Sequence, residues 1–345
     1  MYIKAIFEKP VEQLIDANLD RAREGIRVVE EWCRFAIQDE NLVITLKDFR
    51  HQLANHHDFS YKSARCTSTD KGIGLTHPFQ RDRYSPEELV SANCARVQEA
   101  LRVIEEFARN PDPSLAKTAS KIRYKLYEIE VDILKKIYES QRKKRLQDCN
   151  LYLLTEPQTN LKECVIKSLK AGIKMVQYRN KEGCDKERYQ QAKEISLACK
   201  DFEALFIVND RIDIAIAVNA DGVHLGDKDL PTKTARELLG KDKIIGRSTH
   251  SISEIQKAEK EGCDYLAIGP VNSTTSKPLA SPIGLEVLKE ASITTNLPLF
   301  AIGSINQKNI EEVLANGIKR CAVISAIMHA KDSFEATKKL LEIVK

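Results

Sequence analysis

Short apolar runs, rich in β-branched residues, alternate along the second half of the chain with stretches whose apolar positions recur at helical spacing. The helical patterns include residues 187–200, 252–261, 307–315 and 333–344. The apolar runs are typical of buried parallel strands, and they begin at Leu151, Met175, Ala204, Gly222, Ile244, Tyr265, Leu299 and Cys321. Eight strand–helix units within residues 146–345 predict an α/β fold, the closed (β/α)8 or TIM barrel.

The first half of the chain shows helical periodicity and no series of strands. A long helical pattern over residues 121–145 ends in a basic run at 141–145, and we place the domain boundary there. Residues 1–145 are then a mainly α-helical N-terminal domain, and residues 146–345 are the barrel. We interpret the basic run as a solvated helix end, because positive charges are favourable at a helix C-terminus.

An internal repeat lies in the helical half, where residues 17–31 return as residues 92–106. Each copy predicts an amphipathic helix with opposite charges three or four positions apart, such as Arg27 with Glu31 and Glu30 with Arg34. Exposed pairs of this kind contribute only about 0.2–0.5 kcal/mol each. Two interpretations stay open: a duplicated hairpin with solvated charges, or two helices whose Asn-Arg-Glu faces form a polar cleft.

Composition places the chain among soluble globular proteins, with 42% hydrophobic and 30% charged residues. A net charge of +4 is too small to indicate a nucleic-acid partner, and no apolar run is long enough to span a bilayer. The first residues have no apolar signal-peptide segment. Nine cysteines without any CxxC spacing indicate reduced, buried thiols and a cytoplasmic location, with neither a disulfide framework nor a zinc site.

Polar side chains follow the predicted strands at their carboxyl ends, where this fold places its chemistry. Gln177, Arg179 and Lys181 alternate along one strand and therefore point to the same side. The other polar positions just beyond a strand are Asn209, Asp210, Asp229, Ser248, Lys277, Ser304 and Ser325.

Two kinds of anion site are indicated at this face. The cations Arg179, Lys181 and Lys277, together with the carboxylates Asp210 and Asp229, suit a magnesium-bound diphosphate, because Mg²⁺ prefers carboxylate and phosphate oxygens. The loops after strands 7 and 8 are the usual phosphate-binding place in this fold. The barrel is therefore predicted to hold two phosphorylated ligands, one of them a diphosphate.

Five motifs in the second half resemble, together and in order, those of the thiamine-phosphate synthase family. They are Gln177-Tyr178-Arg179-Asn180-Lys181, Val208-Asn209-Asp210, residues 222–229, residues 269–277 and Val323-Ile324-Ser325. The resemblance implies a Mg²⁺-dependent transferase of thiamine biosynthesis. It would couple 4-amino-5-hydroxymethyl-2-methylpyrimidine diphosphate to thiazole phosphate and release diphosphate. The implied reaction is dissociative, so it needs stabilisation of the leaving group more than proton transfer.

The resemblance also implies roles for the matching positions. The pyrimidine diphosphate would be bound by Gln177, Tyr178, Arg179, Asn180, Lys181, Asn209, Ser248 and Lys277. The thiazole phosphate would be bound by Thr274, Thr275, Ser276, Ser304, Ile324 and Ser325, and Mg²⁺ by Asp210 and Asp229. Arg179, Lys181, Lys277 and Ser248 are the residues expected to act in catalysis.

One position after strand 7 departs from the family, which usually has Gly-Gly-Ile where this chain has Gly303-Ser304-Ile305. The backbone N–H of Ser304 can still bind phosphate, but a positive φ would be strained for serine. His224 lies within the predicted fourth strand, and we interpret it as a packed, hydrogen-bonded histidine because the reaction asks for no strong base.

The first half resembles a domain that precedes this synthase in some bacteria and is similar to a short hydroxymethylpyrimidine-phosphate kinase. The repeat, residues 64–72 and Leu75-Thr76-His77-Pro78 carry the likeness. That family has an aspartate where this chain has Cys66, and no phosphate-binding glycine-rich loop is visible. A kinase and a domain without catalytic activity both stay open.

Two other functions of the barrel compete with the synthase. A thiazole tautomerase has no diphosphate leaving group, so it would not need Asp210, Asp229 and Lys277 together. A non-catalytic sensor of phosphorylated vitamins would bind both ligands without turnover. The expected partners are the small-molecule substrates, with no nucleic acid and no membrane, and homo-oligomer formation stays open.

Overall fold

We describe the protein from a computed structural model, which covers residues 2–66, 85–273 and 281–345. The chain divides into two compact units, Met1–Tyr138 and Glu139–Lys345. The division after Tyr138 and the boundary that we predicted at residue 145 both fall within one long helix, α5 (Pro113–Gln147).

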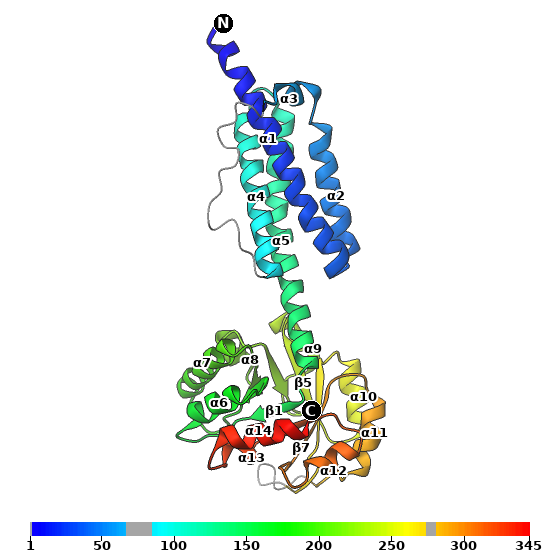
Figure 1. Ribbon diagram of the computed structural model, residues 1–345. Helices are drawn as coiled ribbons and strands as arrows, with labels where there is room; N and C mark the ends of the chain where they lie inside the picture. The colour runs from blue at the N-terminus through cyan, green and yellow to red at the C-terminus, as the bar shows by residue number, and fades with distance from the viewer. Residues whose placement is uncertain (1, 67–84, 274–280) are drawn as a thin grey trace. The chain divides into compact units, whose positions relative to one another are not determined.

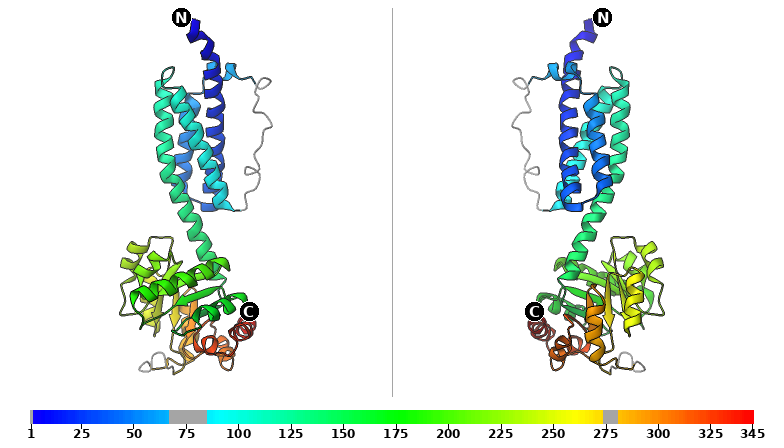
Figure 2. Two further views of the ribbon diagram at one scale, coloured as in Figure 1. Left: turned by 90° about the vertical axis from the view of Figure 1, so that its left-hand side faces the viewer. Right: turned by 90° about the vertical axis from the view of Figure 1, so that its right-hand side faces the viewer.

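The described part of the first unit is helical, as the periodicity predicts. Its long helices lie side by side as a bundle (Figures 1 and 2). The elements are α1 (Tyr2–Trp32), a π-helical turn η1 (Cys33–Ile37), α2 (Glu40–Asn55), α3 (Phe59–Ala64), α4 (Pro86–Phe107) and the first part of α5. One apolar core, with Leu19, Leu46, Leu101 and Leu126 among its fully buried members, holds the bundle together.

The two copies of the repeat lie on α1 and α4, which pack against each other. Gly25 allows the close approach, because a Cβ atom there would lie 2.5 Å from Val97 Cγ2. Asn18 and Asn93 are equivalent: each donates its side-chain amide to the carbonyl four residues earlier, in both cases at 2.8 Å. The repeat is therefore a repeat of structure as well as of sequence.

The charges of the repeat are less solvated than the first interpretation assumed. Arg27 pairs with both Glu30 and Glu31, and Glu30 is only 3% exposed. The partner of Glu30 on another helix is Arg50 of α2, with 2.6 Å between Nε and Oε2, rather than the predicted Arg34. In the second copy, Arg102 pairs with Glu105 and Glu106, and Arg123 of α5 binds Glu105. The pair between Glu30 and Arg50 joins α1 to α2, and the pair between Glu105 and Arg123 joins α4 to α5.

The second unit is the predicted barrel. All neighbouring strands pair in parallel, each with the next in the sequence, and the last pairs with the first (Figure 1). The strands are β1 (Leu151–Leu154), β2 (Met175–Tyr178), β3 (Leu205–Asn209), β4 (Gly222–Leu225), β5 (Ile244–Thr249), β6 (Tyr265–Ile268), β7 (Leu299–Ile302) and β8 (Arg320–Val323).

Helices surround the closed sheet, and most of them lie where the sequence predicts. They are α6 (Leu161–Lys170), α7 (Asp185–Asp201), α8 (Ile212–Ala217), α9 (Thr232–Leu239), α10 (Ile252–Lys260), α11 (Glu286–Thr294), α12 (Ile310–Ala315), α13 (Ser325–Met328) and α14 (Ser333–Ile343).

Alternation along the strands sorts their side chains into two cores. Leu151 and Leu153 of β1 face the helices, whereas Tyr152 and Leu154 belong to the inner core. There the rings of Tyr152, Tyr265 and Phe300 pack edge to face, with centroids 5.3–5.9 Å apart. The Tyr265 ring fits only because residue 246 is glycine, since a Cβ there would lie 2.1 Å from Tyr265 Cζ.

The basic run at 141–145 is not the solvated helix end that we predicted. Arg142 is only 12% exposed at its side chain, and its guanidinium binds Asp221 at 2.9 Å and Asp242 at 3.3 Å. Arg145 approaches Asp221 at 3.6 Å, and Leu146 belongs to the inner core of the barrel. The last turns of α5 are therefore part of the second unit.

Two predictions concern the chain as a whole. Seven of the nine cysteines are buried as expected, but Cys184 is exposed and Cys66 is half-buried. Among the residues that the structure describes, no helix combines the length and the apolar character needed to cross a membrane.

Candidate active site

A cavity of about 600 Å³ opens at the carboxyl ends of the strands. The predicted residues that line it are Gln177, Arg179, Lys181, Asn209, Asp210, Asp229, Ser248, Ser304, Ile324 and Ser325. These residues come from six different strand ends or the loops after them, so the closed sheet brings them together. Thr274, Thr275, Ser276 and Lys277 lie outside the described residues.

Tyr178 and Asn180 are predicted ligands that the structure does not bring to the cavity. The Tyr178 hydroxyl donates to Gln191 Oε1 of α7 at 2.9 Å, and the Asn180 amide donates to the same oxygen at 3.3 Å. Both side chains alternate with Gln177, Arg179 and Lys181, so they point to the opposite side of the strand. The structure therefore places the side chains of Tyr178 and Asn180 outside the cavity lining, and their role as ligands stays a prediction from the motif.

Gln177 is fully buried beneath the cations of the cavity. Its Nε2 donates to the Tyr152 hydroxyl at 2.6 Å, whereas its Oε1 has no hydrogen-bond partner. An unpaired buried carbonyl oxygen is unfavourable by about 1–3 kcal/mol. A ligand that presents an N–H group at this point would satisfy it.

Two carboxylates meet near the mouth of the cavity. Burial raises the pKa of the Asp210 carboxyl, and the adjacent Asp229 carboxyl raises it further, whereas Lys181 Nζ at 3.6 Å acts in the opposite direction. Asp229 Oδ2 accepts a hydrogen bond from the Gly226 N–H at 2.6 Å, which fixes its position. Two adjacent carboxylates are a donor set that fits a hard divalent cation such as Mg²⁺.

His224 is the packed histidine that the sequence predicts. It is 5% exposed, and its ring contacts the Tyr265 hydroxyl through Nδ1 and Ser248 Oγ through Nε2, both at 2.9 Å. The sequence reasoning missed Tyr152 and His250, which also line the cavity, and Tyr265, which lies beneath it. Tyrosines inside apolar runs carry no signal that separates a polar contact from core packing.

Comparison with known proteins decides the family. A family model described as thiamine monophosphate synthase matches residues 151–327. The thiamine-phosphate synthase of Prochlorococcus marinus strain MIT 9313 is 57% identical over 340 residues, which are 97% of this chain and 96% of that protein. The thiamine-phosphate synthase of Synechococcus sp. strain CC9605 is 52% identical over 96% of this chain and 94% of its own length.

The chain belongs to the thiamine-phosphate synthase family. A solved structure agrees: thiamine phosphate pyrophosphorylase from Pyrococcus furiosus is 39% identical, with a TM-score of 0.53 over 59% of this chain and 96% of that one. The resemblance stated from the motifs is therefore confirmed, and so is the barrel.

The loop after β7 shows how this member of the thiamine-phosphate synthase family accommodates Ser304 in place of the usual glycine. Ser304 has a φ of 49°, so it keeps the left-handed conformation that glycine adopts more easily. Gly303 before it cannot be replaced, because a Cβ there would lie 2.7 Å from Pro270. The Ser304 carbonyl accepts hydrogen bonds from the amides of Asn306 and Asn309, which hold the turn in place.

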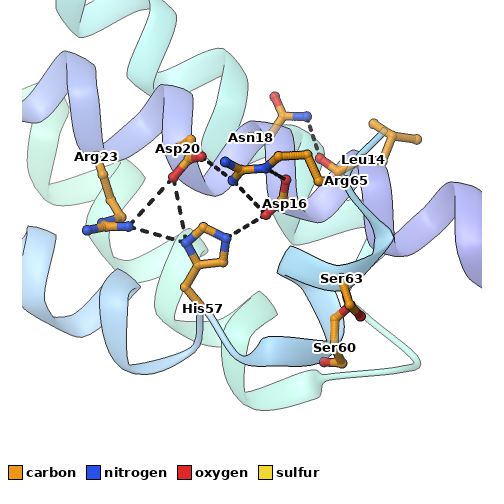
Figure 3. A network of polar contacts seen from close by, with 9 residues as sticks. All are labelled: Leu14, Asp16, Asn18, Asp20, Arg23, His57, Ser60, Ser63 and Arg65. Atoms are coloured by element: carbon orange, nitrogen blue, oxygen red, sulfur yellow. Dashed lines mark hydrogen bonds and ion pairs between the residues drawn. The ribbon is translucent and has the colours of Figure 1, made fainter. Parts of the chain in front are cut away.

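The N-terminal unit matches a second family model, the ThiD2 family, over residues 13–132. A polar cluster joins α1 to the region around α3 in this unit (Figure 3). The buried Asp16 accepts hydrogen bonds from His57 Nε2 and Arg65 Nε, each at 2.7 Å, and Arg65 also binds Asp20. Burial alone would raise the pKa of Asp16, but the bonds from Arg65 and His57 outweigh it and lower the pKa.

This polar cluster exists in only one copy of the repeat. The positions in α4 that correspond to Asp16, Asp20 and Arg23 are Ser91, Ala95 and Gln98. Several polar residues common to both copies make the ion pairs and the amide bonds described above. The duplicated part therefore builds the bundle, and the cluster is an addition to its first half.

Proposed function

We propose that the barrel joins 4-amino-5-hydroxymethyl-2-methylpyrimidine diphosphate to thiazole phosphate, which gives thiamine phosphate and diphosphate. The observation that carries the substrate assignment is the unpaired Oε1 of Gln177, buried in a cavity that also contains Arg179, Lys181 and two carboxylates. This arrangement suits one ligand with an amino group at one end and a diphosphate at the other. The relatives described above carry the same synthase name over nearly the whole chain.

Arg179 and Lys181 stabilise negative charge as it develops on the departing diphosphate. The bond between the pyrimidine methylene carbon and the diphosphate oxygen breaks, and its electron pair leaves with the oxygen. The thiazole nitrogen then supplies the electron pair of the new carbon–nitrogen bond. No proton has to be removed from either substrate, which agrees with a packed rather than a freely accessible His224.

Asp210 and Asp229 would hold the Mg²⁺ ion, which, when bound, would offset charge on the diphosphate. Ser248 contributes a hydroxyl to the same cavity, and Ser304, Ile324 and Ser325 lie where the thiazole phosphate would bind. Thr274, Thr275, Ser276 and Lys277 remain ligands proposed from the family resemblance alone.

An assay of diphosphate release tests the proposal. The full chain with both substrates and Mg²⁺ should release diphosphate and form thiamine phosphate in equal amounts. A thiazole tautomerase would convert a thiazole phosphate isomer without diphosphate release, and a sensor would bind both ligands without turnover. Either of these results would overturn the synthase assignment.

For the N-terminal unit we propose phosphorylation of the pyrimidine monophosphate. The ThiD2 match supports this, together with the Asp16 cluster, which the second copy of the repeat lacks. The full chain with ATP, pyrimidine monophosphate and thiazole phosphate should then form thiamine phosphate, and Asp16→Asn should abolish this activity while the diphosphate is still used. If the unsubstituted chain is inactive with monophosphate and ATP, Cys66→Asp tests whether the family's aspartate restores activity.

We also propose a cytoplasmic location. The proposal rests on buried thiols without CxxC spacing, which suit a reducing compartment. Localisation of a fluorescent fusion in the source cell would test it.

A further inference from the structure

An unbroken chain of hydrogen bonds crosses the interior of the barrel. Gln177 on β2 donates to Tyr152 on β1, and the hydroxyls of Tyr152 and Tyr265 on β6 lie 2.8 Å apart. Tyr265 contacts His224 on β4, which in turn contacts Ser248 on β5. Five side chains from five strands are thus linked by four hydrogen bonds of 2.6–2.9 Å. We name these five residues the relay.

Three members of the relay are shielded from water. Gln177, Tyr152 and Tyr265 are each at most 1% exposed. Burial raises the pKa of both phenols well above its ordinary value, so each keeps its single hydrogen. A buried phenol with one hydrogen donates one hydrogen bond and accepts others. Each of the two phenols therefore contributes one hydrogen to the relay.

Because each hydroxyl has one hydrogen to donate, the direction of one hydrogen bond in the relay sets the direction of the next. Because Gln177 Nε2 is a donor, Tyr152 accepts from it and gives its own hydrogen to Tyr265. Tyr265 then donates to His224 Nδ1. A ring that accepts at Nδ1 carries its hydrogen on Nε2, so His224 donates to Ser248. Ser248 is left with its own hydroxyl hydrogen directed away from the histidine.

The opposite order of donors and acceptors along the relay would need the Gln177 amide to be turned by 180°. Tyr152 would then donate to Oε1, every bond would reverse, and Ser248 would give its hydrogen to His224. In that state the amide would offer a donor to the cavity, and Ser248 would offer an acceptor. The two ends of the relay thus change together.

Both ends of the relay line the cavity. In the order that follows from Gln177 Nε2 as the donor, Gln177 presents an unpaired acceptor, and Ser248 can donate. A ligand with an N–H group near Gln177 and an anionic oxygen near Ser248 matches both ends at once. A ligand with an acceptor near Gln177 and a donor near Ser248 matches neither end.

We propose that Tyr152, Tyr265 and His224 are positioning residues that couple the two ends of the cavity. Acceptance of a ligand N–H by Gln177 fixes Ser248 as a hydrogen-bond donor to a ligand oxygen anion. The ligand class is an amino-substituted heterocycle that bears a diphosphate. Its identity rests on the proposed function, whereas the direction of the relay does not.

The direction can be read without any ligand. In the full chain labelled with ¹⁵N-histidine, the His224 resonances are assigned by their loss in His224→Gln. We expect a neutral ring with hydrogen on Nε2 and none on Nδ1. Tyr265→Phe removes the donor to Nδ1 and should shift the ring toward a mixture of tautomers. If Tyr265→Phe does not fold, Tyr152→Phe cuts the relay one residue earlier and should have the same effect.

Tyr178→Phe is the matched control. It removes the hydroxyl of another buried tyrosine of the barrel, whose hydrogen bond goes to Gln191 outside the relay. This variant should leave the His224 resonances unchanged. A wild-type ring with hydrogen on Nδ1, a charged ring, or an unchanged ring when the relay is cut would overturn the proposal.

A double-mutant cycle measures the coupling itself. In the wild-type background, Gln177→Ala and Ser248→Ala should each raise the KM for the pyrimidine diphosphate by about 5- to 10-fold. The effect of the double variant should differ from the product of the two single effects, because both residues depend on the same set of hydrogen-bond directions. In the Tyr265→Phe background the two effects should become additive. Additivity in both backgrounds, or non-additivity that persists without Tyr265, would contradict the relay.

The two proposals fail in different ways. If the wild-type chain releases no diphosphate, the synthase assignment falls, and the ¹⁵N measurement alone decides the relay. If turnover is normal but the tautomer and the coupling do not depend on Tyr265, the relay falls and the synthase assignment stands.

Discussion

The Ser304 hydroxyl donates a hydrogen bond of 2.6 Å to the backbone carbonyl of Ser273. This bond joins the loop after β7 to the loop after β6, and both loops reach the mouth of the same barrel. Since Ser304 has a positive φ, the residue combines backbone strain with a side-chain contact that glycine cannot make.

Ser304 should affect the thiazole phosphate through this contact. Ser304→Ala keeps the strain and loses the bond, so we expect the KM for thiazole phosphate to rise about 3- to 10-fold. Ser304→Gly loses the bond but relieves strain of about 1 kcal/mol, so its KM should change less. Steady-state kinetics with the pyrimidine diphosphate at saturation measure both. A larger rise for glycine than for alanine would show that relief of backbone strain at residue 304 does not offset the loss of the hydroxyl.

Asp210→Asn should remove most Mg²⁺-dependent turnover and leave the fold intact. Loss of one carboxylate from the proposed metal site is expected to lower kcat by about 100-fold or more. A Mg²⁺ titration of the activity provides the measurement. Asp213→Asn is the control, because Asp213 lies close in sequence but pairs with Arg211 on the surface of α8. Unchanged activity of Asp210→Asn at limiting Mg²⁺ would contradict the metal assignment.

The end of α5 should stabilise the barrel. A fragment of residues 139–345 keeps Arg142 and its bonds to Asp221 and Asp242, whereas a fragment of residues 146–345 loses them. Because these groups are largely shielded from water, we expect the shorter fragment to be less stable by about 2 kcal/mol. Urea unfolding followed by circular dichroism compares the two. Lys143→Ala in the longer fragment is a control, since Lys143 makes only an exposed pair with Glu139. Equal stability of the two fragments would show that the ion pairs contribute nothing.

Asp16 should make the stability of the N-terminal unit depend on pH. Its pKa is lower in the folded unit than the value of about 3.9 expected in the unfolded chain. The carboxylate therefore stabilises the fold above about pH 4, and this contribution is lost as the pH falls through the lowered pKa. Asp16→Asn should reduce the free energy of unfolding by about 2–3 kcal/mol at pH 7 and by less at pH 3.

The fluorescence of Trp32, the one tryptophan of the chain, reports on this unit during urea unfolding. Glu24→Gln makes the same chemical change at an exposed position of the same helix and should have little effect. A difference between Asp16→Asn and wild type that is equally large at pH 3 would show that the charge of Asp16 is not the cause.

Several particular residues show how far the sequence predicts the site. Period-two alternation in β2 correctly places Gln177, Arg179 and Lys181 at the cavity, because strand geometry is local. The same rule directs the side chains of Tyr178 and Asn180 away from the cavity, although the motif includes them. A motif identifies a segment of chain, whereas the alternation decides which of its side chains face the ligand.

By itself, the amino-acid sequence determined the eight strand–helix units, the helical first half, the repeat and the family, since periodicity and ordered motifs are properties of neighbouring residues. Tertiary structure alone decided that Tyr152 meets Tyr265 across 113 positions of sequence, that Arg142 meets Asp221, and that Asp16 is held by His57 and Arg65. These contacts depend on which strands and helices become neighbours when the chain closes. Their energies come from burial and from the pairing of charges, neither of which exists until the fold has formed.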